Sequence, residues 1–252
     1  MICIPPKTGC TTWQKMWLSI NNTDLGYLND TNENPKFSVF KQTPRFDKHM
    51  DSENFHKLTA DPSWKKVVNT RHPFERIHSG WRDKFNSSLS RPKWKLKGVK
   101  QFVSRYLDEI ETHQIRVETT SEMAVSFENF LHYIANSEYT NWNVHFKPVS
   151  FFCTPCEINY DFITDGETLT TDVLQFLRQI KLENNEETFL NDLERQQNNF
   201  SVLKPYKSHK NAQNEFLEIS KRNETLIQLV YDKFKWDFAI FGYSTFGYRI
   251  DT

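Results

Sequence analysis

The sequence predicts an α/β fold in which a central, mainly parallel sheet is flanked by helices, with a helix-rich C-terminal half. Short apolar segments that suit strands alternate with longer amphipathic segments that suit helices. Two of the strand candidates are each followed by a turn with a basic residue and then by a helix candidate. Ligands collect at the carboxyl ends of parallel strands, so these two units also indicate where a site would lie.

The first strand–turn–helix unit spans the first 20 residues. Met1–Ile4 is a short apolar strand candidate. Residues 11–20 (TTWQKMWLSI) place Trp13, Met16 and Trp17 at helical spacing. A turn of six residues joins the two segments.

The stretch of residues 7–12 (KTGCTT), which begins in that turn, has the composition of an anion site. Gly9 lets the backbone approach an anion closely, and successive N–H groups form a cradle. Thr11 and Thr12 would add hydroxyl donors, and Lys7 would neutralise a second anionic group. The usual triphosphate loop ends in GK[ST], so the early lysine disfavours a kinase or another P-loop phosphotransferase. A helix-capping turn with an exposed lysine is the alternative interpretation.

The second unit begins with a short buried strand expected at residues 65–70. Arg71 follows it, and Pro73 suits the first turn of a helix. The helix carries an apolar stripe of Phe74, Ile77, Trp81 and Phe85. The guanidinium of Arg71 and the hydroxyl of Ser79 could jointly hold another phosphate. An ordinary surface arginine beside a helix N-cap is the alternative.

The remaining elements are expected from periodicity. Helices are predicted at about 98–110, 126–136, 168–181 and 210–235, and strands at 148–152 and 160–163. Three of these helices carry apolar stripes that we interpret as core faces rather than ligand sites.

The four cysteines are Cys3, Cys10, Cys153 and Cys156. One Cys-x-x-Cys pair is too little for a four-cysteine zinc site, because Cys3 and Cys10 are badly spaced for a second pair. A disulfide between Cys153 and Cys156, or a pair of buried thiols, is therefore favoured over a metal.

The overall composition limits the function classes. A chain of 252 residues with 32 basic and 32 acidic side chains suits one sizeable domain over residues 1–252, and its zero net charge disfavours a general nucleic-acid binder. No apolar stretch approaches the length of a membrane span, and no signal peptide precedes the first motif. Because the first motif begins almost at Met1, a longer N-terminus is expected to be missing from this chain.

Four segments in the right order resemble a known family. Residues 6–13 (PKTGCTTW) and 71–85 (RHPFERIHSGWRDKF) look like the 5′-phosphosulfate loop and the 3′-phosphate motif of sulfotransferases that use 3′-phosphoadenosine 5′-phosphosulfate (PAPS). Residues 153–163 (CTPCEINYDFI) and 236–243 (WDFAIFGY) match the family's central block and C-terminal signature. The resemblance is greatest to the Golgi carbohydrate sulfotransferases that modify chondroitin, dermatan and the HNK-1 glycan.

The resemblance implies a P-loop-like PAPS sulfotransferase fold, PAPS as the sulfuryl donor, and no metal. The reaction would be in-line transfer of a sulfuryl group to a sugar hydroxyl. Lys7 would act at the leaving group, Arg71 and Ser79 would hold the 3′-phosphate, and Trp13 would pack near the adenine or belong to the core. The 5′-phosphate would be held by the backbone and hydroxyls of Thr8, Gly9, Cys10, Thr11 and Thr12.

The general base and the acceptor site are open in the sequence. His49 lies between the two anion motifs and His145 lies where the family often has a His-Trp pair, with His56 and Glu53 as further options. A basic run with an embedded tryptophan is a candidate acceptor site for an acidic glycan, through Arg91, Lys93, Lys95 and Lys97. A solvated loop is the alternative for that run.

The family's members are typically anchored in the Golgi membrane and face its lumen. The resemblance therefore implies that location, a glycan acceptor as partner, and membrane contact only through an anchor absent from this chain. A complete chain of this length would instead be soluble. The alternative function is a catalytically inactive sulfotransferase-like protein that binds a glycan or a nucleotide.

Overall fold

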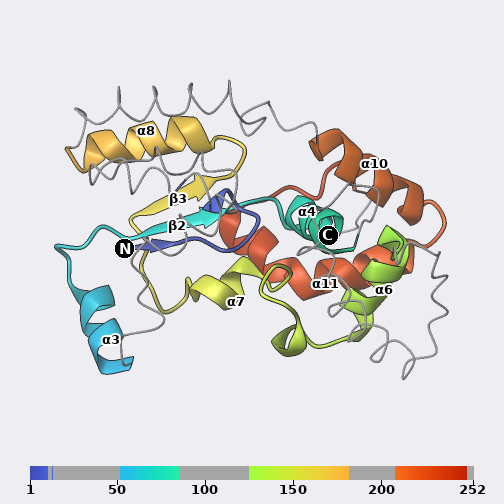
Figure 1. The fold of residues 1–252 in the computed structure, drawn as a ribbon, viewed down its shortest axis with the longest axis horizontal. Coiled ribbons are helices and arrows are strands. Elements are labelled where there is room, and N and C mark those ends of the chain that lie inside the picture. Colours follow the sequence, from blue (N-terminus) through green and yellow to red (C-terminus); the bar gives the residue numbers. More distant parts are fainter. Residues whose placement is uncertain (11–12, 14–51, 86–124, 182–207, 249–252) are drawn as a thin grey trace, which may run out of the picture. The chain divides into compact units, whose positions relative to one another are not determined.

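The computed structural model describes residues 1–10, 13, 52–85, 125–181 and 208–248. The chain divides into two compact units. We call residues 1–71 and 153–206 the sheet unit, and residues 72–152 and 207–252 the helical unit (Figure 1). The expectation of a single domain over residues 1–252 stays a prediction.

The sheet unit contains three parallel strands in the order β1-β2-β3 among the described residues (Figure 1). They are β1 (Ile2–Cys3), β2 (Val67–Thr70) and β3 (Phe162–Asp165). The central strand β2 is buried along its whole length, as expected for a strand with neighbours on both edges and a helix over one face. The parallel sheet is therefore confirmed, although β1 is shorter than predicted and β3 begins two residues later.

Helix α8 (Leu169–Gln179) supplies the core of the sheet unit, and α3 (Ser52–Ala60) precedes β2 in the chain. The predicted apolar stripe of α8 is buried at Val173, Phe176 and Leu177. These side chains form one cluster with the sheet residue Val67. The prediction of a helix over 168–181 is confirmed.

The helical unit is built around aromatic side chains. Its elements are α4 (Pro73–Lys84), α6 (Phe127–Asn136), the 3-10 helix η3 (Tyr139–Asn141), α7 (Val149–Cys153, whose last residue belongs to the sheet unit), α10 (Ser208–Ser220) and α11 (Glu224–Phe241). The rings of Phe74 and Phe216 stack at 4.3 Å, and those of Phe130 and Phe146 lie 4.8 Å apart. All four are fully buried, so ring packing dominates this core.

Two sequence predictions for the helical unit are wrong. The single helix expected at 210–235 is two helices, because α10 ends at Ser220 and the side-chain oxygen of Asn223 caps α11 by accepting a hydrogen bond from the N–H of Leu226 at 3.0 Å. The strand expected at 148–152 is the helix α7. Its N–H groups at Val149 and Ser150 are satisfied by the carboxylate of Asp237, which a sequence pattern rich in β-strand formers does not reveal.

Other predictions are confirmed or lie outside the described residues. The strand at 65–70, the helix after Pro73 and the helix at 126–136 are confirmed within one or two residues. The helix expected at 98–110 lies outside the described residues, as does the one at 11–20 apart from Trp13, which is helical.

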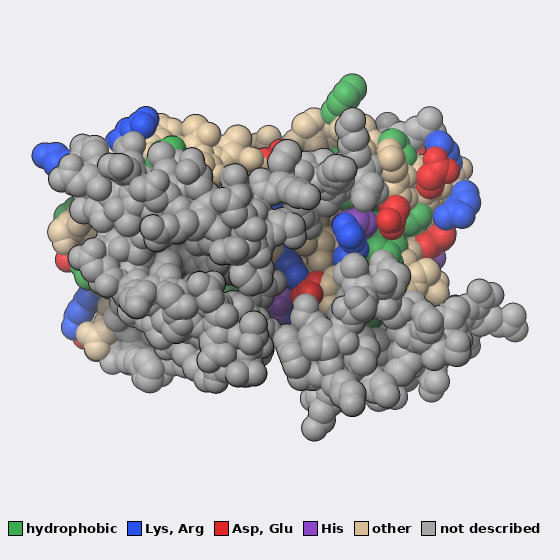
Figure 2. Space-filling view, turned by 45° about the horizontal axis from the view of Figure 1, so that its top comes forward, with side chains coloured by type: hydrophobic (Ala, Val, Ile, Leu, Met, Phe, Trp, Pro, Cys, Tyr) green, Lys and Arg blue, Asp and Glu red, His purple; other side chains and the backbone are tan. Residues whose placement is uncertain are grey.

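Within the described residues, no helix has the length and apolar character needed to cross a membrane. On the face drawn in Figure 2, described acidic and basic side chains lie close to one another, in keeping with the equal numbers of the two in the sequence.

Candidate active site

The carboxyl ends of the three parallel strands define one edge of the sheet unit. Residues 5–10 follow β1, Arg71 follows β2, and residues 166–168 follow β3. Parallel register brings these three turns to the same edge. The topology therefore brings Lys7 and Arg71 together, as the sequence predicts.

The loop after β1 has the backbone geometry of a tight turn into a helix. Lys7 has a φ of 72° and Gly9 a φ of 99°, both in the left-handed region. The φ of Gly9 strains any residue with a Cβ, and a Cβ there would also lie 2.7 Å from Cδ2 of Leu169, so glycine is favoured at this position. Cys10 and Trp13 are helical, and the N–H of Trp13 donates to the carbonyl of Gly9 at 3.3 Å. The first N–H groups of a helix have no intrahelical acceptor, which makes this turn suited to an anion.

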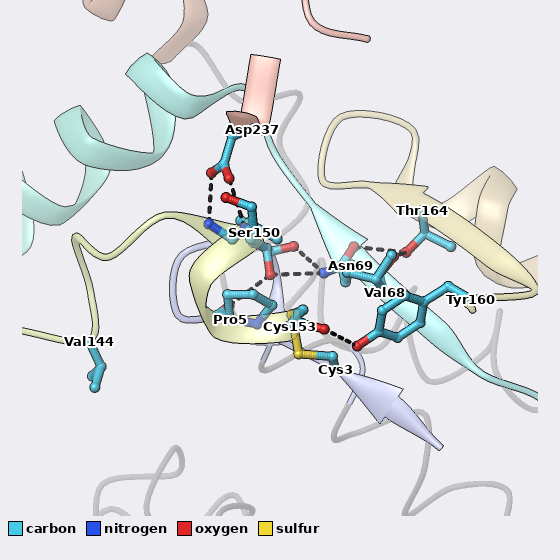
Figure 3. Close-up of a disulfide and its surroundings, with 12 residues drawn as sticks. Cys3, Pro5, Val68, Asn69, Val144, Ser150, Cys153, Tyr160, Thr164 and Asp237 are labelled. Carbon is cyan, nitrogen blue, oxygen red and sulfur yellow. Dashed lines mark hydrogen bonds between the residues drawn. A yellow bond between two sulfur atoms is a disulfide. The ribbon is translucent and has the colours of Figure 1, made fainter. Parts of the chain in front are cut away.

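Asn69 in β2, a residue that was not predicted from the sequence, holds the loop through its side chain. Its side chain is fully buried in β2, and its Nδ2 donates to the carbonyl of Thr8 and, at 3.1 Å, to the Thr8 hydroxyl. Its Oδ1 accepts a hydrogen bond from the hydroxyl of Thr164 at 2.9 Å (Figure 3). The amide therefore ties the loop to both β2 and β3. The available signal was a polar Asn-Thr pair at the end of an apolar strand.

Thr8 is consequently part of the loop's internal structure. Its hydroxyl donates to the carbonyl of Pro5 at 2.7 Å and its side chain is fully buried. Trp13 is also fully buried, and its ring meets that of Phe176 edge-on at 5.9 Å. Of the two alternatives for Trp13, this location is that of a core residue, and its contact with a cofactor stays a prediction.

Arg71 braces the same loop from the end of β2. Its Nη1 donates to the carbonyl of Lys7 at 3.3 Å, and its side chain is only 8% exposed. The β3–α8 turn packs beside it, because the N–H of Gly166 donates to the carbonyl of Thr70 at 2.9 Å and a Cβ on Gly166 would lie 3.6 Å from Cδ of Arg71. Two basic residues thus belong to one short stretch of the sheet edge.

A disulfide fastens the strand that leads into the loop. Cys3 in β1 is bonded to Cys153, with 5.9 Å between their Cα atoms (Figure 3). The predicted Cys153–Cys156 bond is therefore wrong. Cys153 ends α7, whereas Cys156 lies in the following turn, where the N–H of Glu157 donates to the carbonyl of Thr154 at 2.9 Å. Cys156 is an exposed free thiol and Cys10 is a half-buried one.

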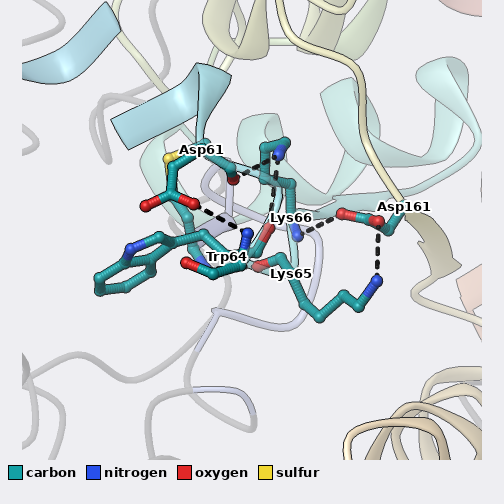
Figure 4. Close-up of polar contacts among 7 residues, drawn as sticks. Asp61, Trp64, Lys65, Lys66 and Asp161 are labelled. Atoms are coloured by element: carbon teal, nitrogen blue, oxygen red, sulfur yellow. Dashed lines mark hydrogen bonds and ion pairs between the residues drawn. The ribbon is translucent and has the colours of Figure 1, made fainter. Parts of the chain in front are cut away.

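The opposite end of β2 has a purely structural set of charges. Asp161 accepts hydrogen bonds from the N–H of Lys66 at 2.8 Å and from the ammonium of Lys65 at 3.3 Å (Figure 4). The bond from the Lys66 backbone is the main cause that lowers the pKa of Asp161. These contacts fix the start of β2, at the end of the strand opposite to Arg71.

In the helical unit, Ser79 is half-buried in the middle of α4. Its neighbour Gly80 allows a close approach, because a Cβ there would lie 2.6 Å from Cε1 of Phe146 and 3.3 Å from the carbonyl oxygen of His145. Helix α4 therefore packs directly against the segment that carries the candidate base His145.

His145 is half-buried and contacts a single amide oxygen twice. Oδ1 of Asn143 accepts a hydrogen bond from the backbone N–H of His145 at 3.1 Å and lies 2.5 Å from Nδ1 of its ring. Asn143 was not predicted as a site residue. Its signal in the sequence is only that an asparagine precedes the histidine by two positions.

A buried pair of opposite charges, Arg76 and Asp237, anchors the ends of this segment. Nη1 of Arg76 donates to the carbonyl of Lys147 at 2.6 Å. Asp237 accepts hydrogen bonds from the N–H groups of Val149 and Ser150, each at 2.7 Å (Figure 3). Burial raises the pKa of Asp237, while these N–H groups and the charge of Arg76 act in the opposite direction.

Several predicted site residues lie outside the described residues. They are Thr11, Thr12, His49, Arg91, Lys93, Lys95 and Lys97. The optional bases Glu53 and His56 are exposed on α3, and Glu53 pairs with Lys57 at 2.7 Å. Within the part of the chain that the structure describes, no three His, Cys, Asp or Glu side chains are grouped so that they could hold a metal ion.

The model of the sulfotransferase family matches residues 1–244. Similar curated proteins include carbohydrate sulfotransferase 9 of Homo sapiens, 27% identical over 97% of this chain and 51% of the relative. Carbohydrate sulfotransferase 12 of Mus musculus is 26% identical over 72% of this chain and 46% of the relative. Carbohydrate sulfotransferase 10 of Homo sapiens is 26% identical over 96% of this chain and 64% of the relative.

The chain thus spans about half to two-thirds of the length of these relatives. No solved structure matches it significantly.

Proposed function

Because this chain belongs to the sulfotransferase family, we propose that it transfers a sulfuryl group from PAPS to a hydroxyl of a glycan such as chondroitin or dermatan. The names of its relatives, carbohydrate sulfotransferases 9, 10 and 12, support a carbohydrate acceptor. The observation that carries the proposal is the loop after β1, where a helix start, Lys7 and Arg71 converge on one sheet edge.

The donor chemistry of this edge fits the phosphosulfate end of PAPS. A helix N-terminus and two cationic residues all favour an anion. An acidic residue, Asp165, also lies at this edge, at the end of β3, and its Oδ1 accepts a hydrogen bond from the N–H of Glu167 at 2.8 Å. The backbone at Gly9 and Cys10 would hold the 5′-phosphate, and the motif of Arg71 and Ser79 in the sequence supports binding of the 3′-phosphate.

PAPS, when bound, supplies an activated sulfuryl group. Lys7 would stabilise negative charge where the phosphate becomes the leaving group, as cationic groups do in phosphoryl transfer. A histidine would accept the proton of the sugar hydroxyl, and His145 and His49 are the two candidates. Arg91, Lys93, Lys95 and Lys97 would bind the acidic groups of the glycan.

We also propose that the chain works in the Golgi lumen. The Cys3–Cys153 disulfide supports this location, because structural disulfides persist in oxidising compartments and are rare in the cytosol.

The proposal is tested by calorimetric titration of 3′,5′-bisphosphoadenosine into the purified chain. Arg71→Ala should abolish binding and Lys7→Ala should weaken it. Arg178→Ala is the matched control, since Arg178 is an exposed arginine near the end of α8 in the same unit. Wild-type affinity is expected for this control.

Transfer of radioactive sulfate from PAPS to chondroitin and dermatan then tests the activity itself. Binding without transfer to any glycan in a broad screen would favour the noncatalytic, nucleotide-binding alternative. A folded wild-type chain that binds no bisphosphoadenosine would exclude the proposed function.

A further inference from the structure

We propose that Asn143 is a positioning residue for His145, which it holds in the one tautomer that can act as the general base. The inference rests on the proposed function and goes beyond it, because it selects one histidine and names the residue that prepares it. It starts from the two contacts that Oδ1 of Asn143 makes with the same histidine.

The first step is to identify the Asn143 atom that faces His145. The oxygen and nitrogen of an amide side chain are exchangeable on shape alone. Here the backbone N–H of His145, which can only donate, lies 3.1 Å from the atom assigned as Oδ1. That atom must therefore be the oxygen, since the NH₂ group has no lone pair to accept such a bond.

The second step follows for the imidazole ring. Nδ1 of His145 lies 2.5 Å from the same oxygen, which has no hydrogen to donate. Nδ1 must then carry the proton. In a neutral ring the other nitrogen, Nε2, holds the lone pair and is the atom able to accept a proton. One amide oxygen thus selects both the orientation and the tautomer of the base.

The third step is the rigidity of the segment around the ring. Arg76 is fully buried, and its two guanidinium nitrogens donate to the carbonyls of Lys147 at 2.6 Å and Val144 at 3.4 Å. Asp237 fixes the next turn through the N–H groups of Val149 and Ser150. The segment is therefore anchored on both sides of His145, which limits how the ring can move.

Two other described histidines of this unit, His72 and His78, are less suited to the role. His72 is 9% exposed, stacks on Tyr248 and lies 3.1 Å from the carbonyl of Ser244. His78 is 1% exposed and faces Glu215. His145 and His132 are both half-buried, and of these two it is the ring of His145 that has a contact orienting it, with Asn143.

Three charged groups on or against this segment, Lys147, Arg76 and Asp237, have hydrogen-bond partners of their own. The ammonium of Lys147 donates to the carbonyl of Thr140 at 2.7 Å and lies over the ring of Phe151. Arg76 is occupied by backbone carbonyls, and the carboxylate of Asp237 by backbone N–H groups.

In the reaction, the acceptor oxygen would bond to sulfur as the bond between sulfur and the phosphate oxygen breaks. The proton of the acceptor hydroxyl passes to Nε2, and Nδ1 keeps its proton and its bond to Asn143. The resulting imidazolium returns one proton to solvent after the sulfated glycan leaves. No oxidant, reductant or further reactant is needed.

The tautomer can be measured without any activity, by two-bond ¹H–¹⁵N NMR of the folded chain with His145→Gln to assign the signal. At a pH where the ring is neutral, His145 should show the protonated Nδ1 and unprotonated Nε2 pattern. Asn143→Ala should convert this pattern to a mixture, and Asn136→Ala, a change to an exposed amide at the end of α6, should leave it unchanged. An Nε2–H tautomer in the wild type would overturn the inference.

A double-mutant cycle on the transfer reaction tests the role of the contact. His145→Gln should lower kcat by roughly 10²–10⁴-fold, the usual contribution of a general base. Asn143→Ala should lower kcat by about tenfold or more alone and by nothing further in the His145→Gln background. Asn143→Asp should keep most activity, because a carboxylate also accepts the Nδ1 proton, and should move the acidic limb of the pH–rate profile to higher pH.

Bisphosphoadenosine binding separates this inference from the proposed function. All four variants should bind it as the wild type does. Suppose that the wild type binds bisphosphoadenosine and transfers sulfate, but Asn143→Ala still lowers kcat in the His145→Gln background. That result overturns the positioning role of Asn143 and leaves the proposed function intact. A wild type that neither binds nor transfers defeats the proposed function, while the NMR result still decides the tautomer.

Discussion

In the sheet unit the candidate anion donors are backbone groups on a loop, whereas in the helical unit the candidate base is a side chain on a segment between helices. The loop is held by a neutral amide, Asn69, by Gly9 with its φ of 99°, and by the disulfide at Cys3. The His145 segment is tied down by two buried charges, Arg76 and Asp237, within an aromatic core.

The two units differ in how much stability is lost when one of these stabilising contacts is removed. A neutral hydrogen bond contributes little to net stability, so breaking one should change the loop more than the fold. A buried charge without its partner is far more costly, so breaking the charged tie should affect the whole helical unit. The groups that hold the site should therefore be separable from the fold in the sheet unit, where Asn69 holds the loop, and inseparable from it in the helical unit, where Arg76 and Asp237 hold the His145 segment.

The largest effect is expected for Asp237→Ala. The change leaves Arg76 buried without its nearby carboxylate and leaves the N–H groups of Val149 and Ser150 without their acceptor. We expect a loss of about 3–5 kcal/mol in the free energy of unfolding. Urea denaturation followed by near-ultraviolet circular dichroism, which reports on the aromatic core, measures it.

The control for this prediction is Asp232→Ala, which removes an exposed carboxylate from the same helix. Its unfolding should match that of the wild type. Asp237→Asn should lie between the two, since its amide oxygen can still accept one of the two N–H groups. If Asp237→Ala were as stable as the wild type, Asp237 would not be needed to hold the His145 segment, and the predicted difference between the two units would be wrong.

Loss of the disulfide should have the next largest effect. In Cys3→Ser/Cys153→Ser the closed loop of the chain is opened, and the denatured state regains the entropy that a cross-link between residues 150 positions apart removes. The expected loss is about 2–4 kcal/mol. Thermal unfolding with and without reductant measures it, and Cys156→Ser should have no effect because that thiol is free. A double variant as stable as the wild type would argue against this cross-link.

The features that could be predicted from the sequence are those that depend on a few neighbouring residues. Local patterns predicted the β2 strand, Gly9 and the helix after Pro73, because strand, turn and helix propensities act over a few residues. The Cys3–Cys153 bond and the Asp237 contacts join residues more than 80 positions apart, so no local pattern contains them. The strand wrongly expected at 148–152 shows the consequence, since tertiary hydrogen bonds there overrode β propensity.

The candidate site was also predicted only in part. Lys7 and Arg71 were found because their charges stand out beside turns. Asn69 and Asn143 were missed, because a neutral amide in a chain rich in asparagine gives no signal until its hydrogen-bond partners are known. Sequence reasoning thus finds the groups that would touch a ligand more readily than the groups that hold them.

Asn69→Ala tests whether loop and fold are separable in the sheet unit. The buried carbonyl and hydroxyl of Thr8 lose their donor, and the Thr164 hydroxyl loses its acceptor. We expect about 1–3 kcal/mol of destabilisation with the fold retained. Binding of bisphosphoadenosine should fall at least tenfold. Asn159→Ala, an exposed amide in the same unit, is the control. Unchanged binding in a folded Asn69→Ala chain would show that the amide does not shape the anion site.

The smallest effect is expected for Asp161→Asn, at the sheet edge away from the candidate site. The hydrogen bond from the Lys66 backbone lowers the pKa of Asp161 in the folded state below its value in the unfolded chain, which is about 3.9. The ionised carboxylate therefore stabilises the fold above that pH, and the contribution is lost as pH falls through the lower folded-state pKa. Because solvent and salt screen this partly exposed group, the difference between wild type and variant should be under about 1 kcal/mol at pH 7.

Melting temperatures measured from pH 7 to pH 3 should show the wild type and Asp161→Asn converging below about pH 4. The control is Glu53→Gln, which breaks an exposed ion pair on α3 and should shift Tm little at any pH. Bisphosphoadenosine affinity should be unchanged in Asp161→Asn, because its contacts fix the start of β2 and not the end. If affinity fell as much as in Asn69→Ala, the anion site would depend on the whole strand, and the sheet unit would no longer differ from the helical unit in keeping site and fold separable.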